Sequence, residues 1–369
     1  MSIELEIQLV AVVVAVACAL SGVFLVLRRM ALMSDAISHT VLLGIVLGFF
    51  ITQDITSPLL VGGAALVGVA TVGLVELLQR TRLVREDAAI GLVFPALFSI
   101  AVILIARFAG SVHLDTDAVL LGEIAFAPFR RLEIGGVDLG PRTLWVMGGV
   151  LLLNVLFIVA LYKELKLSTF DPGLAAALGF SPVVLHYGFM TLVSITAVGA
   201  FDAVGSILVV ALMIAPPATA YLLSDSLPRV LVLSAVIAAA AALLGFWSAW
   251  LVDASIAGSM ATAAGLLFLL AFLLGPDRGL IAVARRRRRQ RWECARLMLA
   301  IHLMHHEDAP DAESESQEAH LGEHLRWEPA FAKRVVRESQ EEDLLIRSSD
   351  GRLVLTARGR DAAKRAMFN

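Results

Sequence analysis

The chain has 369 residues, of which 58% are hydrophobic and only 17% are charged. Soluble domains are closer to half apolar and a quarter charged, so this composition excludes an ordinary soluble enzyme, a disordered regulator and a disulfide-stapled secreted fold. The formal net charge of −3 gives no indication that the chain as a whole binds nucleic acid.

Charged residues are concentrated toward the C-terminal end. Of the first 276 residues 29 are charged, whereas 34 of the last 93 are charged. We therefore predict a membrane-embedded part followed by a soluble tail. The expected division is a transmembrane domain at 1–282, a basic juxtamembrane linker at 283–291 and a cytosolic domain at 292–369.

Apolar runs long enough to cross about 30 Å of hydrocarbon, roughly 20 residues each, recur throughout the first part. The sequence predicts an all-α polytopic membrane protein with eight or nine transmembrane helices. The expected spans are 7–27, 31–51, 58–79, 88–108, 143–161, 183–200, 204–223, 229–251 and 255–275. Only Phe201 and Asp202 separate the sixth run from the seventh. Glu4 and Glu6 precede the first run, which is therefore expected to be a span and not a cleaved signal peptide.

Basic residues recur in alternate loops, and this pattern predicts the orientation by the positive-inside rule. Arg28 and Arg29 follow the first run. Further basic residues occupy every second loop after it: Arg80, Arg82, Arg85, Lys163, Lys166, Arg229, Arg278 and the five arginines at 285–289. The N-terminus is thus expected outside and the tail in the cytosol. The 109–142 loop, which is acidic overall, is then outside.

Small residues and helix breakers are frequent within the predicted spans. Gly44 and Gly48 form a GxxxG pair, which allows close helix packing, and Pro216 and Pro217 interrupt another span. Interrupted helices are tolerated where the freed backbone is buried in protein or faces water, which favours a transporter or channel over a simple anchor. The sequence has no GxxxxGK[ST] motif, so ATP hydrolysis is not expected on this chain.

A carboxylate and an imidazole lie four residues apart in the second predicted span. Asp35 and His39 share one helix face at this spacing. Ionisable groups within a span are costly and are functional candidates by default. Together they suit manganese, iron or zinc, since no thiolate is present to select a softer ion. Spacing alone equally permits a structural hydrogen-bonded pair.

Four stretches of the chain resemble the metal-type ABC importer permeases, the manganese, zinc and iron family. The first contains Ser34-Asp35-Ala36-Ile37-Ser38-His39, and the others lie at 171–181, 204–216 and 268–279. The resemblance covers roughly residues 5–282. It implies a permease subunit, not an enzyme, that moves a divalent ion, manganese first and zinc or iron as alternatives, across a bacterial inner membrane. It implies no permanently bound cofactor, only the transported divalent ion.

The same resemblance implies roles and partners. Asp35 and His39 match the family's metal ligands on the translocation path. The residues that match the cytoplasmic coupling helix, which docks on the ATPase, are Asp171, Ala175, Ala176 and Gly179. The implied partners are an ABC ATPase subunit, an extracytoplasmic metal-binding protein and a second permease chain, identical or different.

The outside loop contains the alternating residues His113, Asp115 and Asp117. Alternate residues of an extended segment face one side, so these three could receive metal from a binding protein. A solvated acidic loop without such a role is the other interpretation.

The tail resembles the winged-helix part of iron- and manganese-dependent repressors, an α+β fold, over about 290–367. The matching residues are 344–346, a turn at Asp350-Gly351 that is typical of a hairpin, and 355–360. DNA binding is not expected, because acidic residues flank the basic candidates of the recognition helix. A protein-interaction or regulatory module is the alternative.

Histidines are concentrated in this tail. They are His302, His305, His306, His320 and His324. Pairs at i, i+4 could hold a first-row metal and regulate import, or they could be ordinary surface histidines. Two rival functions for the whole chain are a permease for a metal chelate or other small solute, and a membrane-tethered metal-responsive regulator.

Overall fold

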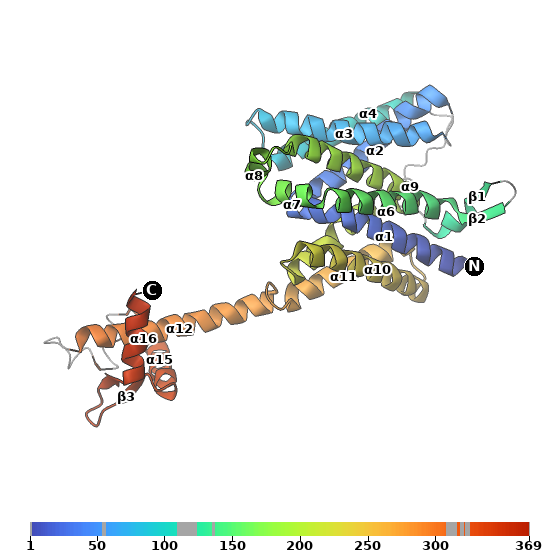
Figure 1. Cartoon of the computed structure of the whole chain (residues 1–369). Coiled ribbons are helices and arrows are strands. Elements are labelled where there is room, and N and C mark those ends of the chain that lie inside the picture. The colour runs from blue at the N-terminus through green and yellow to red at the C-terminus, as the bar shows by residue number, and fades with distance from the viewer. Residues whose placement is uncertain are drawn as a thin grey trace. The chain divides into compact units, whose positions relative to one another are not determined.

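A computed structural model of the chain describes residues 2–53, 57–108, 124–134, 137–307, 316–317, 321 and 325–368. It divides into two compact units, Met1–Gly279 and Leu280–Asn369, which we call unit 1 and unit 2 (Figure 1).

Unit 1 is a bundle of long apolar helices. They are α1 (Ile3–Leu27), α2 (Ala31–Thr52), α3 (Pro58–Arg80), α4 (Glu86–Phe108), α6 (Arg142–Ala160), α9 (Pro182–Leu223), α10 (Leu227–Val252) and α11 (Ile256–Leu274). These are the eight helices in the described part of the chain that are long and apolar enough to cross a membrane. They confirm the predicted polytopic helical fold, and their bounds follow the expected spans closely.

Serine caps and prolines define where several of these helices begin. Ser57, Ser181 and Ser255 each accept a hydrogen bond from a backbone N–H of the first helical turn. Pro58 and Pro182 follow the first two of these caps, where proline loses no intrahelical hydrogen bond. These serines and prolines, which lie at the ends of the apolar runs in the sequence, therefore determine where the helices begin.

Helices α1 and α9 form the centre of unit 1. In each of them 67% of the most apolar stretch is buried, against 22% in α4, α6 and α11. The peripheral helices thus keep most of their apolar surface available to lipid or to another protein.

The 42-residue helix α9 turns sharply back at Gly205. The ring centroid of Phe189 lies 5.7 Å from that of Phe24 in α1. The carbonyl of Met213 lies against Gly22 of α1, where a Cβ on the glycine would be 2.0 Å from the carbonyl oxygen. In a straight helix Phe189 and Met213 would be about 36 Å apart. Gly205 has φ +77°, which is accessible to glycine at little cost. α9 therefore makes two passes, as the two predicted spans at 183–200 and 204–223 require.

The α2–α3 contact depends on glycine. A Cβ on Gly44 would lie 2.4 Å from the Cα of Ala64, and one on Gly63 would lie 2.8 Å from the Gly44 carbonyl oxygen. The hydroxyl of Thr71 also donates to that of Thr40 at 2.9 Å. The predicted GxxxG pair thus marks a real close approach of two helix backbones.

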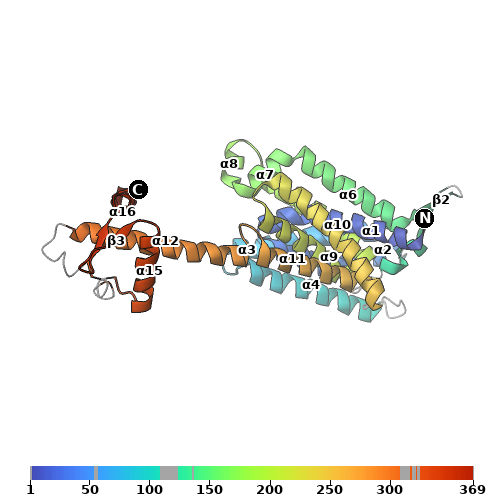
Figure 2. The same ribbon diagram turned by 90° about the horizontal axis from the view of Figure 1, so that it is seen from below.

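Short elements occupy the two ends of the bundle. The 3₁₀ helix η1 (Ile124–Phe129) precedes an antiparallel hairpin of β1 (Arg131–Ile134) and β2 (Val137–Pro141), while α7 (Tyr162–Phe170) and α8 (Pro172–Ala177) follow α6. Figures 1 and 2 show the hairpin at the end where the N-terminus lies and α8 at the opposite end. The hairpin was not predicted, since its short strands carry no long alternating pattern.

Ion pairs connect the hairpin region to α1 and α9. An Arg131 Nη lies 3.3 Å from the Glu6 carboxylate of α1, and Arg130 donates to Asp202 at 3.1 Å. The backbone N–H of Gly140 and the Arg131 side chain both donate to Asp138, and they hold the pKa of that carboxyl below its usual range. The turn of α9 at Gly205 therefore lies beside the hairpin and is connected to it through Asp202.

Unit 2 is a small α+β domain. It contains α12 (Leu280–His306), α15 (Pro329–Glu341), β3 (Leu345–Arg347), β4 (Leu353–Leu355) and α16 (Ala357–Phe368). β3 and β4 pair antiparallel around a turn in which Gly351 has φ +86°, so the Asp-Gly hairpin is confirmed. A separate core includes Leu299, Val335, Leu345, Leu353 and Ala363.

The border between the units falls after Gly279, and the residues expected to form a linker at 283–291 lie inside α12. Arginine is a good helix former, so a run of five arginines continues a helix as readily as it interrupts an apolar pattern. The arginine run therefore does not break the secondary structure.

Candidate functional site

Asp35 and His39 lie together near the N-terminal end of α2. The Nε2 atom of His39 is 3.4 Å from Oδ1 of Asp35. Their side chains are 40% and 27% exposed, so both remain accessible within an otherwise apolar bundle. At 100° per residue, these two residues lie about 140° to 180° around α2 from Gly44. The polar pair therefore faces away from the tight contact with α3.

Aromatic side chains of α4 flank the pair. The His39 ring stacks on Phe94 at a centroid distance of 5.5 Å and meets the ring of Phe98 at 6.0 Å in an edge-on arrangement. These contacts fix the orientation of the imidazole beside the carboxylate. A carboxylate and a neutral imidazole so placed can provide two ligands to a divalent cation.

A third ligand from this chain is not found in the part that the structure describes, where no group of three His, Cys, Asp or Glu side chains comes together. The predicted outside residues His113, Asp115 and Asp117 lie outside the described residues. Asp35 and His39 thus form a two-residue polar pair on an accessible helix face.

The expected coupling residues form a short helix with a defined start and end. Asp171 accepts a hydrogen bond from the N–H of Leu174 at 2.9 Å and so caps α8. Gly179 has φ +85° and ends the turn. Ala175 is buried within the bundle, whereas Ala176 is exposed. Leu174, Leu178 and Phe180 are also exposed, which gives this end of the bundle an apolar surface.

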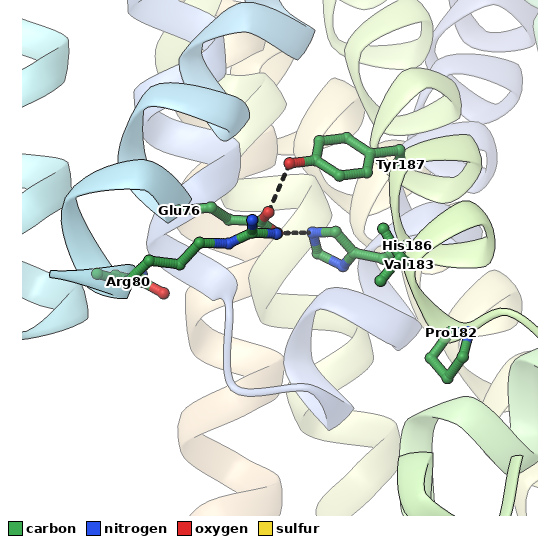
Figure 3. A pocket seen from close by; sticks show the side chains of 7 residues that line it. Glu76, Arg80, Pro182, Val183, His186 and Tyr187 are labelled. Atoms are coloured by element: carbon green, nitrogen blue, oxygen red, sulfur yellow. Dashed lines mark hydrogen bonds and ion pairs between the residues drawn. The ribbon is translucent and has the colours of Figure 1, made fainter. Parts of the chain in front are cut away.

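A second polar cluster joins α3 to the start of α9, close to α8. The carboxylate of Glu76 receives a hydrogen bond from the Tyr187 hydroxyl at 2.6 Å and lies 2.6 Å from Nε2 of His186 (Figure 3). Arg28, directly after α1, reaches Nδ1 of His186 at 3.5 Å. The sequence analysis singled out neither His186 nor Glu76 as a functional residue. The available signal was a lone carboxylate within a predicted span.

The described histidines of unit 2 are neighbours at the end of α12. The ring centroids of His302 and His306 are 4.8 Å apart, and those of His305 and His306 are 5.3 Å apart. Glu307, next along the chain, forms an ion pair with Arg360 of α16. The other two predicted residues, His320 and His324, lie outside the described part of the chain.

Comparison with known proteins identifies relatives of both units. A model of the ABC 3 transport family matches residues 4–275. The chain is 49% identical over 355 residues to the zinc transport system membrane protein TroD of Treponema pallidum, covering 96% of each chain. It is 47% identical over 281 residues to the manganese transport system membrane protein MntD of Bacillus subtilis, covering 76% of this chain and 95% of that relative.

A solved structure supports the same fold. A chain of PsaBC from Streptococcus pneumoniae in complex with Fab matches with a TM-score of 0.63 and 29% identity, covering 75% of this chain and 94% of that chain. The alignment with TroD is longer than unit 1, so it extends into unit 2. The alignment with MntD already covers 95% of that protein, which leaves too little length for a counterpart of unit 2.

Proposed function

This chain belongs to the ABC 3 transport family, and from that premise we propose that it is the permease subunit of an ABC importer for divalent metal ions. Manganese and zinc are the first candidates, since relatives at 47% and 49% identity carry those metals in their names, and iron is the third. The observation that carries the proposal is the Asp35–His39 pair on an accessible face of α2.

The pair provides ligands of the right chemistry for such ions. A carboxylate and an imidazole bind manganese, iron and zinc, and neither selects a soft monovalent ion. The imidazole coordinates only in its neutral form, so protons compete with the metal and acidification weakens binding. Further ligands would come from a second permease chain or from water, because α2 presents only these two.

The energy for transport would come from a partner. We assign docking on an ABC ATPase subunit to α8, whose exposed Ala176, Leu174 and Leu178 form an apolar surface at one end of the bundle. A pair of ATPase subunits needs two such helices, and this chain provides one, which argues for a second permease chain. An extracytoplasmic binding protein would deliver the ion at the opposite end, near the β1–β2 hairpin.

The location follows from the charge pattern. Arg28, Arg80 and Arg278 lie at helix ends, and the positive-inside rule assigns those ends to the cytosol. We therefore propose a multi-pass protein of the bacterial inner membrane with unit 2 on the cytosolic side. Unit 2 would regulate import or brace the assembly, and DNA binding is not part of the proposal, because acidic residues accompany the basic face of α15.

A regulatory metal at the end of α12 is a second proposal. His302 and His306 are spaced i, i+4, and their rings lie 4.8 Å apart, a separation that allows two imidazoles to share one cation. A metal bound there would report its cytosolic concentration to the permease. This metal site would be distinct from the transport site, because His302 and His306 belong to unit 2.

The deciding experiment is uptake by the purified complex in liposomes, with manganese, zinc and iron offered singly and in competition. ATP-dependent uptake of one free divalent ion, inhibited by the others, is expected. Uptake of a metal chelate but of no free ion would instead identify a chelate permease. Specific retention of DNA by unit 2, with no uptake of any solute, would favour a membrane-tethered regulator.

A further inference from the structure

The guanidinium of Arg28 joins three elements of unit 1. Its Nε atom donates to Oγ1 of Thr169 and one Nη donates to Oγ of Ser168, each at 3.1 Å, while the other Nη lies 3.5 Å from Nδ1 of His186. The group also lies over the ring of Phe189, 5.1 Å from its centroid. Burial lowers the pKa of Arg28 to about 10, so the side chain still carries its charge at neutral pH.

The contacts of His186 indicate which of its nitrogens carries the proton. Arginine can only donate, so Nδ1 is the acceptor and the hydrogen is on Nε2, beside the Glu76 carboxylate at 2.6 Å. The Nε2 atom makes no hydrogen bond, so its contact with the carboxylate is electrostatic. A neutral imidazole therefore lies between a cation on one side and an anion on the other.

The cluster borders a pocket of about 450 Å³, which Arg80 and Gln79 also line. Figure 3 shows the Arg80 side chain extending across this pocket from α3. The cluster and its pocket contain two arginines, Arg28 and Arg80, and one carboxylate, that of Glu76. That balance opposes a cation and argues against a second metal site here. The contacts of Arg28, His186 and Glu76 instead connect α7, α9 and α3.

The contacts of Arg28 connect the segment next to α8 with the helices α2 and α3, which in a coupled transporter have to move together with α8. Ser168 and Thr169 belong to the last turn of α7, directly before α8, and α2 begins at Ala31, three residues after Arg28. Glu76 is on α3, which packs on α2 at Gly44. A continuous set of short contacts thus leads from α8 to the helix that carries Asp35 and His39.

We propose that Arg28, His186 and Glu76 are positioning residues that transmit movement of α8 to the α2–α3 pair and so couple ATP hydrolysis to metal release. The proposal rests on the proposed transport function. If the linkage is broken, the ATPase still turns over, but α2 no longer follows it. Fewer ions then move for each ATP.

The test measures ATP hydrolysis and metal uptake in the same proteoliposomes, using the full chain with its ATPase and binding protein. Arg28→Gln and Glu76→Gln should each lower the uptake-to-ATP ratio at least about fivefold, the lower end of common coupling effects. The double variant should lose little more, because either change breaks the same chain of contacts. Arg80→Gln, in the same pocket but outside that chain, is the charge-matched control and should keep the ratio.

A milder change guards against a folding defect. Ser168→Ala with Thr169→Val removes only the two hydroxyls that Arg28 contacts on α7, and should lower the ratio while assembly and thermal stability stay normal. Unchanged ratios in all variants of a complex that takes up metal would overturn the coupling role alone. A wild-type complex that hydrolyses ATP but takes up no metal would overturn the proposed function and, with it, this role.

Discussion

Asp35 and Gly44 lie on opposite faces of one helix: Gly44 allows α2 to touch the α3 backbone, while Asp35 lies with His39 on the accessible side. The tight contact leaves no room for a Cβ, which would come within 2.4 Å of Ala64 Cα. Packing one face of α2 against a neighbouring backbone holds the other face, with the two proposed ligands on it, at a defined position. The first two predictions address the two faces separately.

Asp35→Asn and His39→Gln are each expected to abolish metal uptake while the complex still assembles. Each change preserves approximate size but removes a ligand of the transported cation, and a half-site with one ligand binds much more weakly. Uptake in proteoliposomes and gel filtration of the complex check both parts. Ser38→Ala, a neighbour on the same helix that bonds only within it, is the control. Normal transport by either variant would contradict the site.

Gly44→Leu is expected to destabilise unit 1, because its side chain would be forced into the α3 backbone. Overpacking of this kind typically costs about 1–3 kcal/mol. Thermal unfolding of the purified chain in detergent measures the effect. Gly62→Leu is the matched control, since a Cβ at Gly62 meets nothing within 4 Å. Equal effects of the two changes would argue against the close α2–α3 contact.

The sequence predicted the helices of unit 1 well because apolar length dominates inside a membrane. It also predicted the pairing of Asp35 with His39, which needs only helical periodicity. The Glu76–His186 contact joins positions 110 residues apart, and such pairs depend on tertiary packing that a local pattern does not contain. The sharp turn of α9 at Gly205 shows both cases: the apolar runs indicated two passes, but they did not show that the turn is made at Gly205.

Ala176→Trp is expected to lower ATP-driven uptake without altering folding. Ala176 is exposed on α8, so the larger side chain is tolerated in the isolated permease, but it would block close docking of the helix on the ATPase. Binding of the ATPase and stimulated hydrolysis are the measurements. Leu59→Trp, at an exposed position of α3 away from α8, controls for added bulk. Full stimulation by the Ala176 variant would exclude α8 as the docking element.

The β1–β2 hairpin should loosen in acid. The pKa of Asp138 lies below its usual range because Gly140 N–H and Arg131 donate to the carboxylate. The contribution of this carboxylate to hairpin stability is therefore fully present above about pH 3.9, the ordinary aspartate value. It is lost as the pH falls through the lower pKa of the folded state. The Trp145 indole donates to the Leu139 carbonyl in β2, and its fluorescence reports the change. Asp138→Asn should show the loosened signal already at neutral pH. A signal independent of both pH and this substitution would contradict the role of Asp138.

Removal of unit 2, residues 280–369, is expected to leave a chain that inserts and transports. The cut falls at the border between the units, it spares α8 and the Asp35–His39 pair, and unit 2 packs around its own apolar core. It also spares Arg278, which donates to the Tyr221 carbonyl at 3.2 Å at the end of unit 1.

The truncation should change regulation. If metal at His302 and His306 slows import, uptake by the full chain falls when liposomes are preloaded with metal, whereas uptake by the truncated chain does not. Substitution of both histidines by glutamine in the full chain should reproduce the truncation, which separates metal sensing from loss of the domain. Equal inhibition in full-length and truncated complexes would reject sensing. A truncated chain that no longer binds the ATPase would show that unit 2 braces the assembly instead.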